Sequence, residues 1–195
     1  MIFLDVENLK DAKVTLTLIF LNIIVYIIFN ITLPPDYLLF FAQINRNIIY
    51  NYEIWRLFTP IFLHADIMHL FSNMFALLIF GATIETNFNI SKIQYLLIYF
   101  TSGLIGNIFS LFLLSVDSIS VGASGAIFGL IGVVFFMVAT EERSLIPFVL
   151  IYIIYFITAS FMPGVNIWAH IAGLLGGLLG GYIFYYRKNR YEITY

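Results

Sequence analysis

The stretch Gly122-Ala123-Ser124-Gly125 places a serine between small residues, where a polar loop meets an apolar run. Such a serine either belongs to the packing surface between two helices or acts as a nucleophile that its neighbours leave uncrowded. Small residues are common where membrane helices touch each other. Packing is therefore the explanation that the rest of the chain has to overturn.

Histidines are the other side chains suited to base catalysis near neutral pH. The chain has three of them, His64, His69 and His170, and it has no cysteine. The lack of cysteine excludes disulfides, thiolate catalysis and zinc–thiolate sites. His64 and His69 lack a third ligand and the spacing of a zinc-binding helix, so we expect neither a metal nor another cofactor.

The composition indicates a membrane protein. Of the 195 residues, 62% are hydrophobic and only 10% are charged, and the mean hydropathy is +0.98. A soluble domain of this size needs far more charge on its surface. The formal net charge of −2 and the lack of a long basic block argue against a nucleic-acid partner. We therefore expect nearly all of the chain to lie in the lipid bilayer.

Six apolar segments are long enough to span a membrane, at about 14–31, 67–84, 93–114, 124–140, 145–161 and 167–186. They predict an all-α bundle of six transmembrane helices that forms one membrane domain over 1–195. The first segment is expected to be a retained anchor, not a cleaved signal peptide. The fourth and fifth span roughly 25 Å at about 1.5 Å per residue, so their outer ends should lie below the membrane surface.

Basic residues predict the orientation, because cytoplasmic loops carry an excess of lysine and arginine. With the N-terminus inside, the outer face has only Arg46 and Arg56. The inner face then holds Lys10, Lys13, Lys92, Arg143, Arg187, Lys188 and Arg190. The sequence therefore predicts that both termini are inside and that the second, fourth and sixth helices begin at the outer face.

The first loop, at about 34–66, is much longer than the other loops. Pro34 and Pro35 end the first helix, and aromatic residues then alternate with asparagines and arginines. This mixture favours the headgroup zone, where rings are half buried and polar tips stay wet. We expect the loop to lie in the outer interface and partly enter the bilayer. An extracellular ligand-binding loop is the alternative.

The predicted topology brings Ser124, His170, His69 and Asn73 to similar depth near the outer face. Polar and ionisable groups inside lipid are costly and by default mark a function. His69 and Asn73 are four residues apart and share one helical face. A small transporter or channel would instead distribute polar groups across the membrane depth, or break its helices near the midplane.

Glycines indicate how Ser124 and His170 approach each other. Helices with small faces pack closely, and the fourth and sixth helices have such faces, with Gly125, Gly129 and Gly132 on one and Gly173, Gly177 and Gly181 on the other. If these faces meet, the imidazole can take the hydroxyl proton, which a serine needs to become a good nucleophile. No aspartate is placed to orient the histidine, so the pattern indicates a Ser–His dyad.

Groups that stabilise an oxyanion occur in the same region. Ser124 at the start of a helix lies beside unpaired backbone N–H groups and the positive end of the helix dipole. His69 and Asn73 can add side-chain donors. Phe128, one turn after Ser124, can stack on the His170 ring and hold its orientation.

These motifs resemble those of the rhomboid intramembrane serine proteases, over the whole chain and in family order. The matching patterns are Gly-x-Ser-Gly (Gly122, Ser124, Gly125), His-x-x-x-Asn (His69, Asn73), Ala-His-x-x-Gly-x-x-x-Gly (Ala169, His170, Gly173, Gly177), Trp55-Arg56 and Gly-x-x-x-Glu (Gly81, Glu85). Two positions depart from the family. Asn89 stands where a glycine is usual, and Phe128 stands where some relatives have tyrosine.

The resemblance implies that Ser124 is the nucleophile, that His170 is the base, and that His69, Asn73 and the Ser124 backbone N–H form the oxyanion hole. It also implies a minimal six-helix, multi-pass protein of the cell membrane whose active site opens to the outer face. Its substrates would be transmembrane segments of other proteins, cut near their outer end at a small residue. A catalytically inactive relative that binds membrane segments is the alternative; it predicts loss of the serine or the histidine.

Other polar residues have simpler expected roles. We expect Glu85 to cap or pair within the inner loops and Trp55-Arg56 to anchor the first loop. His64 is expected to support the site or contact water, with catalysis as a less favoured role. Three asparagines are expected to hydrogen-bond between helices: Asn22, Asn30 and Asn107.

Overall fold

The computed structural model describes residues 6–88 and 90–192, and this part of the chain is nearly all helical. Asn89, one of the two departures from the family pattern, lies outside the described residues. Wider π-type turns continue α1 over Ile27–Thr32 and join α4 to α5 over Leu77–Gly81. The helices of the bundle are α1 (Lys13–Tyr26), α4 (Ile67–Ala76), α5 (Ala82–Asn87), α6 (Lys92–Leu113), α7 (Ser124–Glu141), α8 (Ile146–Ala159) and α9 (Ile167–Glu192).

Further short elements form the connections between these helices. The first loop contains α2 (Pro35–Phe41), β1 (Gln43–Ile44), α3 (Asn45–Asn51) and two 3-10 turns, at Ile54–Leu57 and Thr59–Phe62. Just before α7, β2 (Ile119–Ser120) pairs antiparallel with β1, with Gln43 opposite Ser120 and Ile44 opposite Ile119. Further 3-10 turns lie at Val6–Asp11 and Arg143–Leu145.

Among the described residues, five helical segments are long and apolar enough to cross a membrane: Lys13–Thr32, Ile67–Asn87, Lys92–Leu113, Ser124–Glu141 and Ile167–Tyr186. Each lies within three residues of a predicted segment at either end. A further apolar segment, Arg143–Ala159, is shorter. It ends before the predicted boundary because the chain turns over 160–164, where Gly164 has a φ of +81°.

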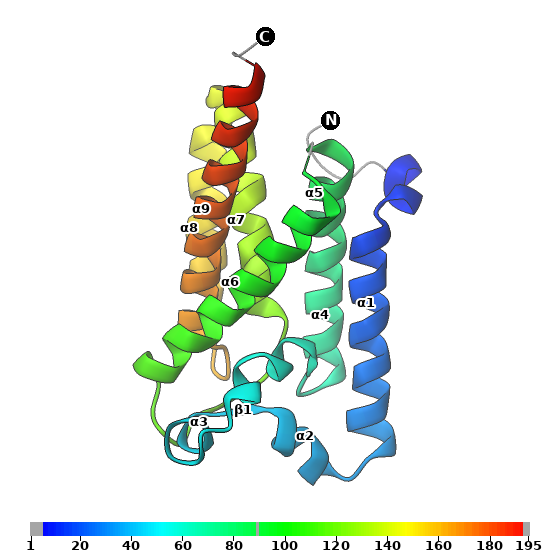
Figure 1. The fold of residues 1–195 in the computed structure, drawn as a ribbon, viewed down its shortest axis with the longest axis vertical. Helices are drawn as coiled ribbons and strands as arrows, with labels where there is room; N and C mark the ends of the chain where they lie inside the picture. Colours follow the sequence, from blue (N-terminus) through cyan, green and yellow to red (C-terminus); the bar gives the residue numbers. More distant parts are fainter. Residues whose placement is uncertain (1–5, 89, 193–195) are drawn as a thin grey trace.

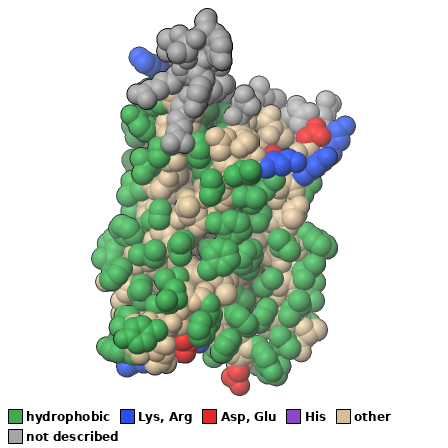
Figure 2. Space-filling model, in the orientation of Figure 1, with side chains coloured by type: hydrophobic (Ala, Val, Ile, Leu, Met, Phe, Trp, Pro, Cys, Tyr) green, Lys and Arg blue, Asp and Glu red, His purple; other side chains and the backbone are tan. Residues whose placement is uncertain are grey.

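The surface and the arrangement of the helices are those of a multi-pass membrane protein. In Figure 1 the beginning of α1 and the end of α9 lie at the top of the view, and the first loop, with α2 and α3, lies at the bottom. Figure 2 shows hydrophobic side chains over the middle of the visible face and charged ones only towards its two ends. Charged groups are costly in hydrocarbon, so this middle band is the surface that faces lipid.

The helix at the centre of the bundle is α7. Within its spanning segment 72% of the residues are buried inside the protein, compared with 17% for α1. Of the residues from Gly125 to Val138, only Phe136 is not buried. A helix that is hydrophobic all round belongs inside a protein or a membrane, and α7 lies against both α6 and α9.

Glycines allow the backbones of α7 and α9 to touch. A Cβ atom added to Gly177 would overlap the carbonyl oxygen of Gly129, and one added to Gly173 would overlap that of Gly125. The predicted contact between the glycine faces of these two helices is therefore confirmed. A second row on α9 faces α6 instead, because a Cβ on Gly180 would meet Ile98 at 3.4 Å.

At the other end of the bundle from the first loop, Glu85 joins α5 to α1. Its carboxylate accepts hydrogen bonds from the backbone N–H groups of Val14 at 2.8 Å and Thr15 at 2.9 Å. The Thr15 hydroxyl also lies 3.1 Å from the hydroxyl of Tyr95 in α6. An anion at a helix N-terminus is stabilised by the unpaired N–H groups and the dipole. The expected capping role of Glu85 is confirmed.

Arg56 anchors the first loop, as expected. Arg56 is buried, and its side chain donates hydrogen bonds to the carboxylate of Glu53 and to the carbonyls of Leu39 at 2.5 Å and Ala42 at 2.7 Å. The hydrogen bond from the Arg56 guanidinium holds the pKa of Glu53 below its usual value. The buried guanidinium thus joins the later part of the first loop to backbone carbonyls near its beginning.

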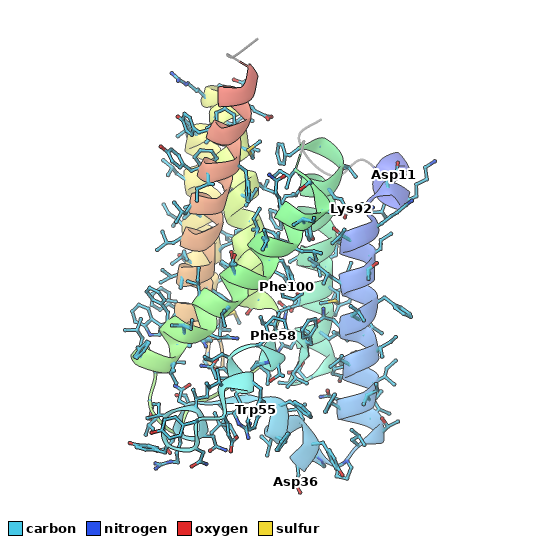
Figure 3. The ribbon with its side chains drawn as sticks, in the orientation of Figure 1. Asp11, Asp36, Trp55, Phe58, Lys92 and Phe100 are labelled. Carbon is cyan, nitrogen blue, oxygen red and sulfur yellow. The ribbon has the colours of Figure 1, made fainter. Side chains whose placement is uncertain are left out.

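The first loop is also fixed to α6. The side-chain amide of Asn107 donates to the Leu57 carbonyl at 2.8 Å, and the amide of Gln43 donates to the Asn107 carbonyl at 3.0 Å. The rings of Phe58 and Phe100 lie 5.3 Å apart, and Figure 3 shows them where the loop meets α6. The loop is therefore a packed part of the protein.

Asn30 and Asn107 bond the first loop and not a facing helix, so for these two residues the prediction of helix-to-helix bonds was wrong. Asn107 bonds α6 to the first loop, and Asn30 donates to the loop carbonyl of His64 at 3.0 Å. The Asn22 amide donates to the carbonyl of Leu18 in its own helix at 2.8 Å. Asn30 and Asn107 bond loop carbonyls because the first loop packs against the helices that carry them.

The glycine contact predicts that Gly177→Ala destabilises the protein and that Gly180→Ala, one turn away on the same helix, does not. The added methyl group at position 177 must push α9 away from the Gly129 carbonyl, which typically costs about 1–3 kcal/mol. At position 180 the same methyl group makes ordinary contact with Ile98. Thermal unfolding in detergent micelles measures both variants. Equal midpoints for Gly177→Ala and the wild type would contradict the backbone contact.

Candidate active site

Ser124 is the first residue of α7, and the preceding loop sets its position. The N–H of Gly122 donates to the Pro60 carbonyl at 2.9 Å, which ties this loop to the first loop. Gly122 has a φ of +132°, which side-chain-bearing residues rarely adopt. A Cβ there would also lie 2.8 Å from Nε2 of His69 and 3.7 Å from Oγ of Ser124. Both the backbone conformation and the approach of His69 therefore require glycine.

His170 lies in the first turn of α9, against α7. Its ring stacks on Phe128, with centroids 4.0 Å apart and planes inclined by 13°. The neighbouring Ala169 packs on Gly125, where an added Cβ would lie 3.4 Å from the Ala169 carbonyl oxygen. Ser124 and Phe128 are one turn apart, so Ser124 lies on the side of α7 that carries the imidazole. The sequence predicts this stacking, and the structure contains it.

The Nδ1 atom of His170 has a partner that the sequence analysis missed. Ser160 directly follows α8, is 3% exposed, and places its Oγ 2.7 Å from Nδ1. The same Oγ lies 2.8 Å from the carbonyl oxygen of Phe156. Ser160 directly follows one helix and His170 lies in the next, with a turn between them, so no helical spacing connects them. The sole signal in the sequence is a small polar residue at the end of an apolar helix.

His69 and Asn73 occupy the first two turns of α4. Asp66 caps this helix, since its carboxylate accepts a hydrogen bond from the His69 N–H at 2.8 Å. Asn73 is 6% exposed, and its side-chain nitrogen has no hydrogen-bond partner within the described part of the chain. Buried donors are nearly always paired, because an unpaired one is costly. Asn73 therefore holds a donor that is available to a bound group.

His64 is completely buried, with its ring edge-on to that of His69 and the centroids 5.1 Å apart. Burial, with a smaller contribution from the nearby His69, lowers the pKa of His64 to about 3. The ring is therefore neutral at physiological pH. The ring packs against that of His69, which agrees with the expected supporting role of His64.

Asn166 holds together three segments around His170. Its side-chain oxygen accepts a hydrogen bond from the Ala169 N–H at 3.1 Å, which caps α9. Its amide nitrogen donates to the hydroxyls of Ser110 in α6 at 2.8 Å and Ser120 in β2 at 3.1 Å. The start of α9 is thereby joined to the segment that leads into α7.

These groups are suited to acyl transfer. Ser124 carries a hydroxyl at a helix N-terminus, one turn before the phenylalanine on which the His170 imidazole stacks, and Asn73 carries an unpaired amide donor on α4. Nucleophilic attack on a carbonyl requires groups of these three kinds. A metal site has less support, since the described residues contain no cluster of three or more histidine, aspartate or glutamate side chains that could hold an ion.

Comparisons with known proteins agree with this chemistry. A family model described as "Rhomboid domain" matches residues 51–187, more than half of the chain. A Bacillus subtilis (strain 168) protein named "Putative rhomboid protease YdcA" is 38% identical over 147 residues, which cover 72% of each chain. Rhomboid-like protease 3 of Toxoplasma gondii is 34% identical over 149 residues, 71% of this chain and 54% of its own.

A plant relative is longer. RHOMBOID-like protein 1 of Arabidopsis thaliana is 36% identical over 148 residues, which make up 73% of this chain but 37% of the relative. The chain thus spans between about a third and a half of the plant and Toxoplasma relatives, and most of the Bacillus one. The extent of the family match and the identity to these relatives show that the chain belongs to the rhomboid family.

Proposed function

We propose that this chain is an intramembrane serine endopeptidase that cuts transmembrane segments of other membrane proteins. The observation that carries the proposal is the stacking of the His170 ring on Phe128, one helical turn after Ser124. In the proposal Ser124 is the nucleophile and His170 is the general base. The names of the Bacillus and Toxoplasma relatives describe proteases, which supports the same reaction class.

The dyad acts in two steps. His170 accepts the hydroxyl proton as Ser124 Oγ attacks the carbonyl carbon of the scissile peptide bond. The imidazolium then gives this proton to the leaving nitrogen, and an acyl-enzyme remains. In the second step the same imidazole deprotonates a water molecule, which attacks the ester carbonyl; the imidazolium then returns the proton to Ser124 Oγ as this oxygen leaves, and the second product is released.

The oxyanion formed in each step accepts hydrogen bonds from Asn73, His69 and the backbone N–H of Ser124. The buried, unpaired side-chain nitrogen of Asn73 supports this role, because an oxyanion supplies the acceptor that the described residues lack. The positive end of the α7 dipole adds to the stabilisation. The glycine at position 122 supports the arrangement, since a side chain there would displace His69.

We also propose that residues 1–195 form one rhomboid domain with six crossings, the short α8 being the fifth, and with both termini inside. The beginning of α1 and the end of α9 lie at the same end of the molecule, as an even number of crossings requires (Figure 1). The site then opens to the outer face of the cell membrane. In this view the lower ends of α7 and α9 lie above α2 and α3 of the first loop. This supports a site that is recessed from the outer face, with the interfacial first loop lying farther out than the site.

Removing either dyad member should abolish cleavage. The purified protein is reconstituted in liposomes with a fluorescent transmembrane substrate, and the wild type is compared with Ser124→Ala and His170→Ala. Loss of the nucleophile or the base in a serine protease lowers kcat by about 10⁶-fold, so both variants should fall to background. Cleavage that survives Ser124→Ala would refute the proposal. A wild type that binds the substrate without cutting it would favour the inactive, segment-binding alternative.

Asn73→Ala should lower the rate less than Ser124→Ala, because it removes only one oxyanion donor. Loss of such a donor costs about 2.7–4 kcal/mol of barrier, or roughly 10²–10³ in kcat. The same liposome assay measures the effect. Ser72→Ala is a matched control, because the exposed Ser72 hydroxyl bonds only the His69 carbonyl of its own helix, and it should keep the wild-type rate. Equal losses in Asn73→Ala and Ser124→Ala would indicate a structural role for Asn73.

A further inference from the structure

We propose that Ser160 is a positioning residue that fixes which ring nitrogen of His170 carries the proton. In this assignment the C-terminal end of α8 performs the orienting task that a carboxylate performs in a serine protease triad. The inference rests on the proposed roles of Ser124 and His170. Its structural part concerns the free enzyme and is testable without a substrate.

The direction of the hydrogen bonds follows from the number of protons. Ser160 has one hydroxyl proton and two neighbours, the Phe156 carbonyl oxygen at 2.8 Å and Nδ1 of His170 at 2.7 Å. A carbonyl oxygen only accepts, so the contact with Phe156 uses the hydroxyl proton. The Ser160 oxygen must then accept from His170, which places the neutral ring's proton on Nδ1. The opposite arrangement would leave two oxygen lone pairs facing each other at 2.8 Å.

Burial makes this arrangement hard to replace. Ser160 is 3% exposed and His170 is 8% exposed, so little room exists for a water molecule to substitute for the hydroxyl. The backbone N–H of Ser160 also bonds the carbonyls of Phe156 at 3.2 Å and Ile157 at 3.0 Å. The hydroxyl is therefore held by the last turn of α8, and its position does not depend on the substrate.

Two contacts together determine the orientation of the ring. Stacking on Phe128 sets the plane of the imidazole, and the bond to Ser160 sets its rotation within that plane. With the proton on Nδ1, the lone pair is on Nε2, the nitrogen that a serine base requires. When the ring takes the Ser124 proton, the Nδ1–H bond remains, and the negative end of the α8 dipole favours the imidazolium.

The tautomer is measured directly by NMR. The full-length protein is labelled with ¹⁵N-histidine in detergent micelles, and long-range ¹H–¹⁵N spectra distinguish a protonated from an unprotonated ring nitrogen. His170→Gln identifies the signals of His170 among the three histidines. We expect Nδ1 protonated and Nε2 unprotonated in the wild type, and a mixture of tautomers in Ser160→Ala. A wild-type ring protonated on Nε2 would overturn the proposal.

Kinetics test the consequence. Ser160→Ala should lower kcat by about tenfold or more with KM unchanged, less than the roughly 10⁴-fold loss that a wrong tautomer causes in a triad. Ser160→Thr keeps the hydroxyl and should restore most of the rate and the tautomer. Thr158→Val is the matched control, because Thr158 bonds the carbonyl four residues before it at 2.7 Å on the same helix but is exposed, and it should behave like the wild type.

Each remaining outcome decides the question. Ser160→Ala with the wild-type tautomer and kcat would refute a positioning role. Equal losses in Ser160→Ala and Thr158→Val would assign the effect to helix stability and refute it as well. Failure of the dyad itself is seen separately, as cleavage that persists in Ser124→Ala while the NMR result on His170 stands.

Discussion

The backbones of α7 and α9 touch because neither helix carries a side chain at the points of contact. Gly125 and Gly129 face Gly173 and Gly177 so closely that a single added methyl group would overlap a carbonyl oxygen. Between two membrane helices there is little hydrophobic gain, so close backbone packing is a main source of attraction. This one contact brings the start of α9, and with it the imidazole, to the start of α7.

Helix ends supply most of the electrostatics around the candidate site. The start of α4 is capped by Asp66, the start of α7 carries Ser124, and the start of α9 is capped by Asn166. The end of α8 reaches the imidazole through Ser160. At the start of α7 and the end of α8 backbone dipoles act without a charged side chain, which avoids the cost of burying a further charge in an apolar bundle.

Loops that are fixed by hydrogen bonds hold these helix ends in place. Pro60 of the first loop bonds Gly122 directly before Ser124, and Asn107 ties the same loop to α6. Arg56 closes the loop by donating hydrogen bonds to the carbonyls of Leu39 and Ala42. The first loop therefore supports the segment that leads into α7. Its place in the membrane interface stays a prediction.

The sequence alone determined the membrane class, the helical segments to within a few residues, and the family motifs. Those signals are local: apolar length, glycine spacing and residues four apart on one helix. Only the tertiary structure decided the acceptors of Asn22, Asn30 and Asn107, the complete burial of His64, and the bond from Ser160 to His170. These features depend on how helices and loops meet in space. A polar group bonds the nearest free partner, and that partner can come from a segment far away in the sequence, so the local sequence pattern does not predict it.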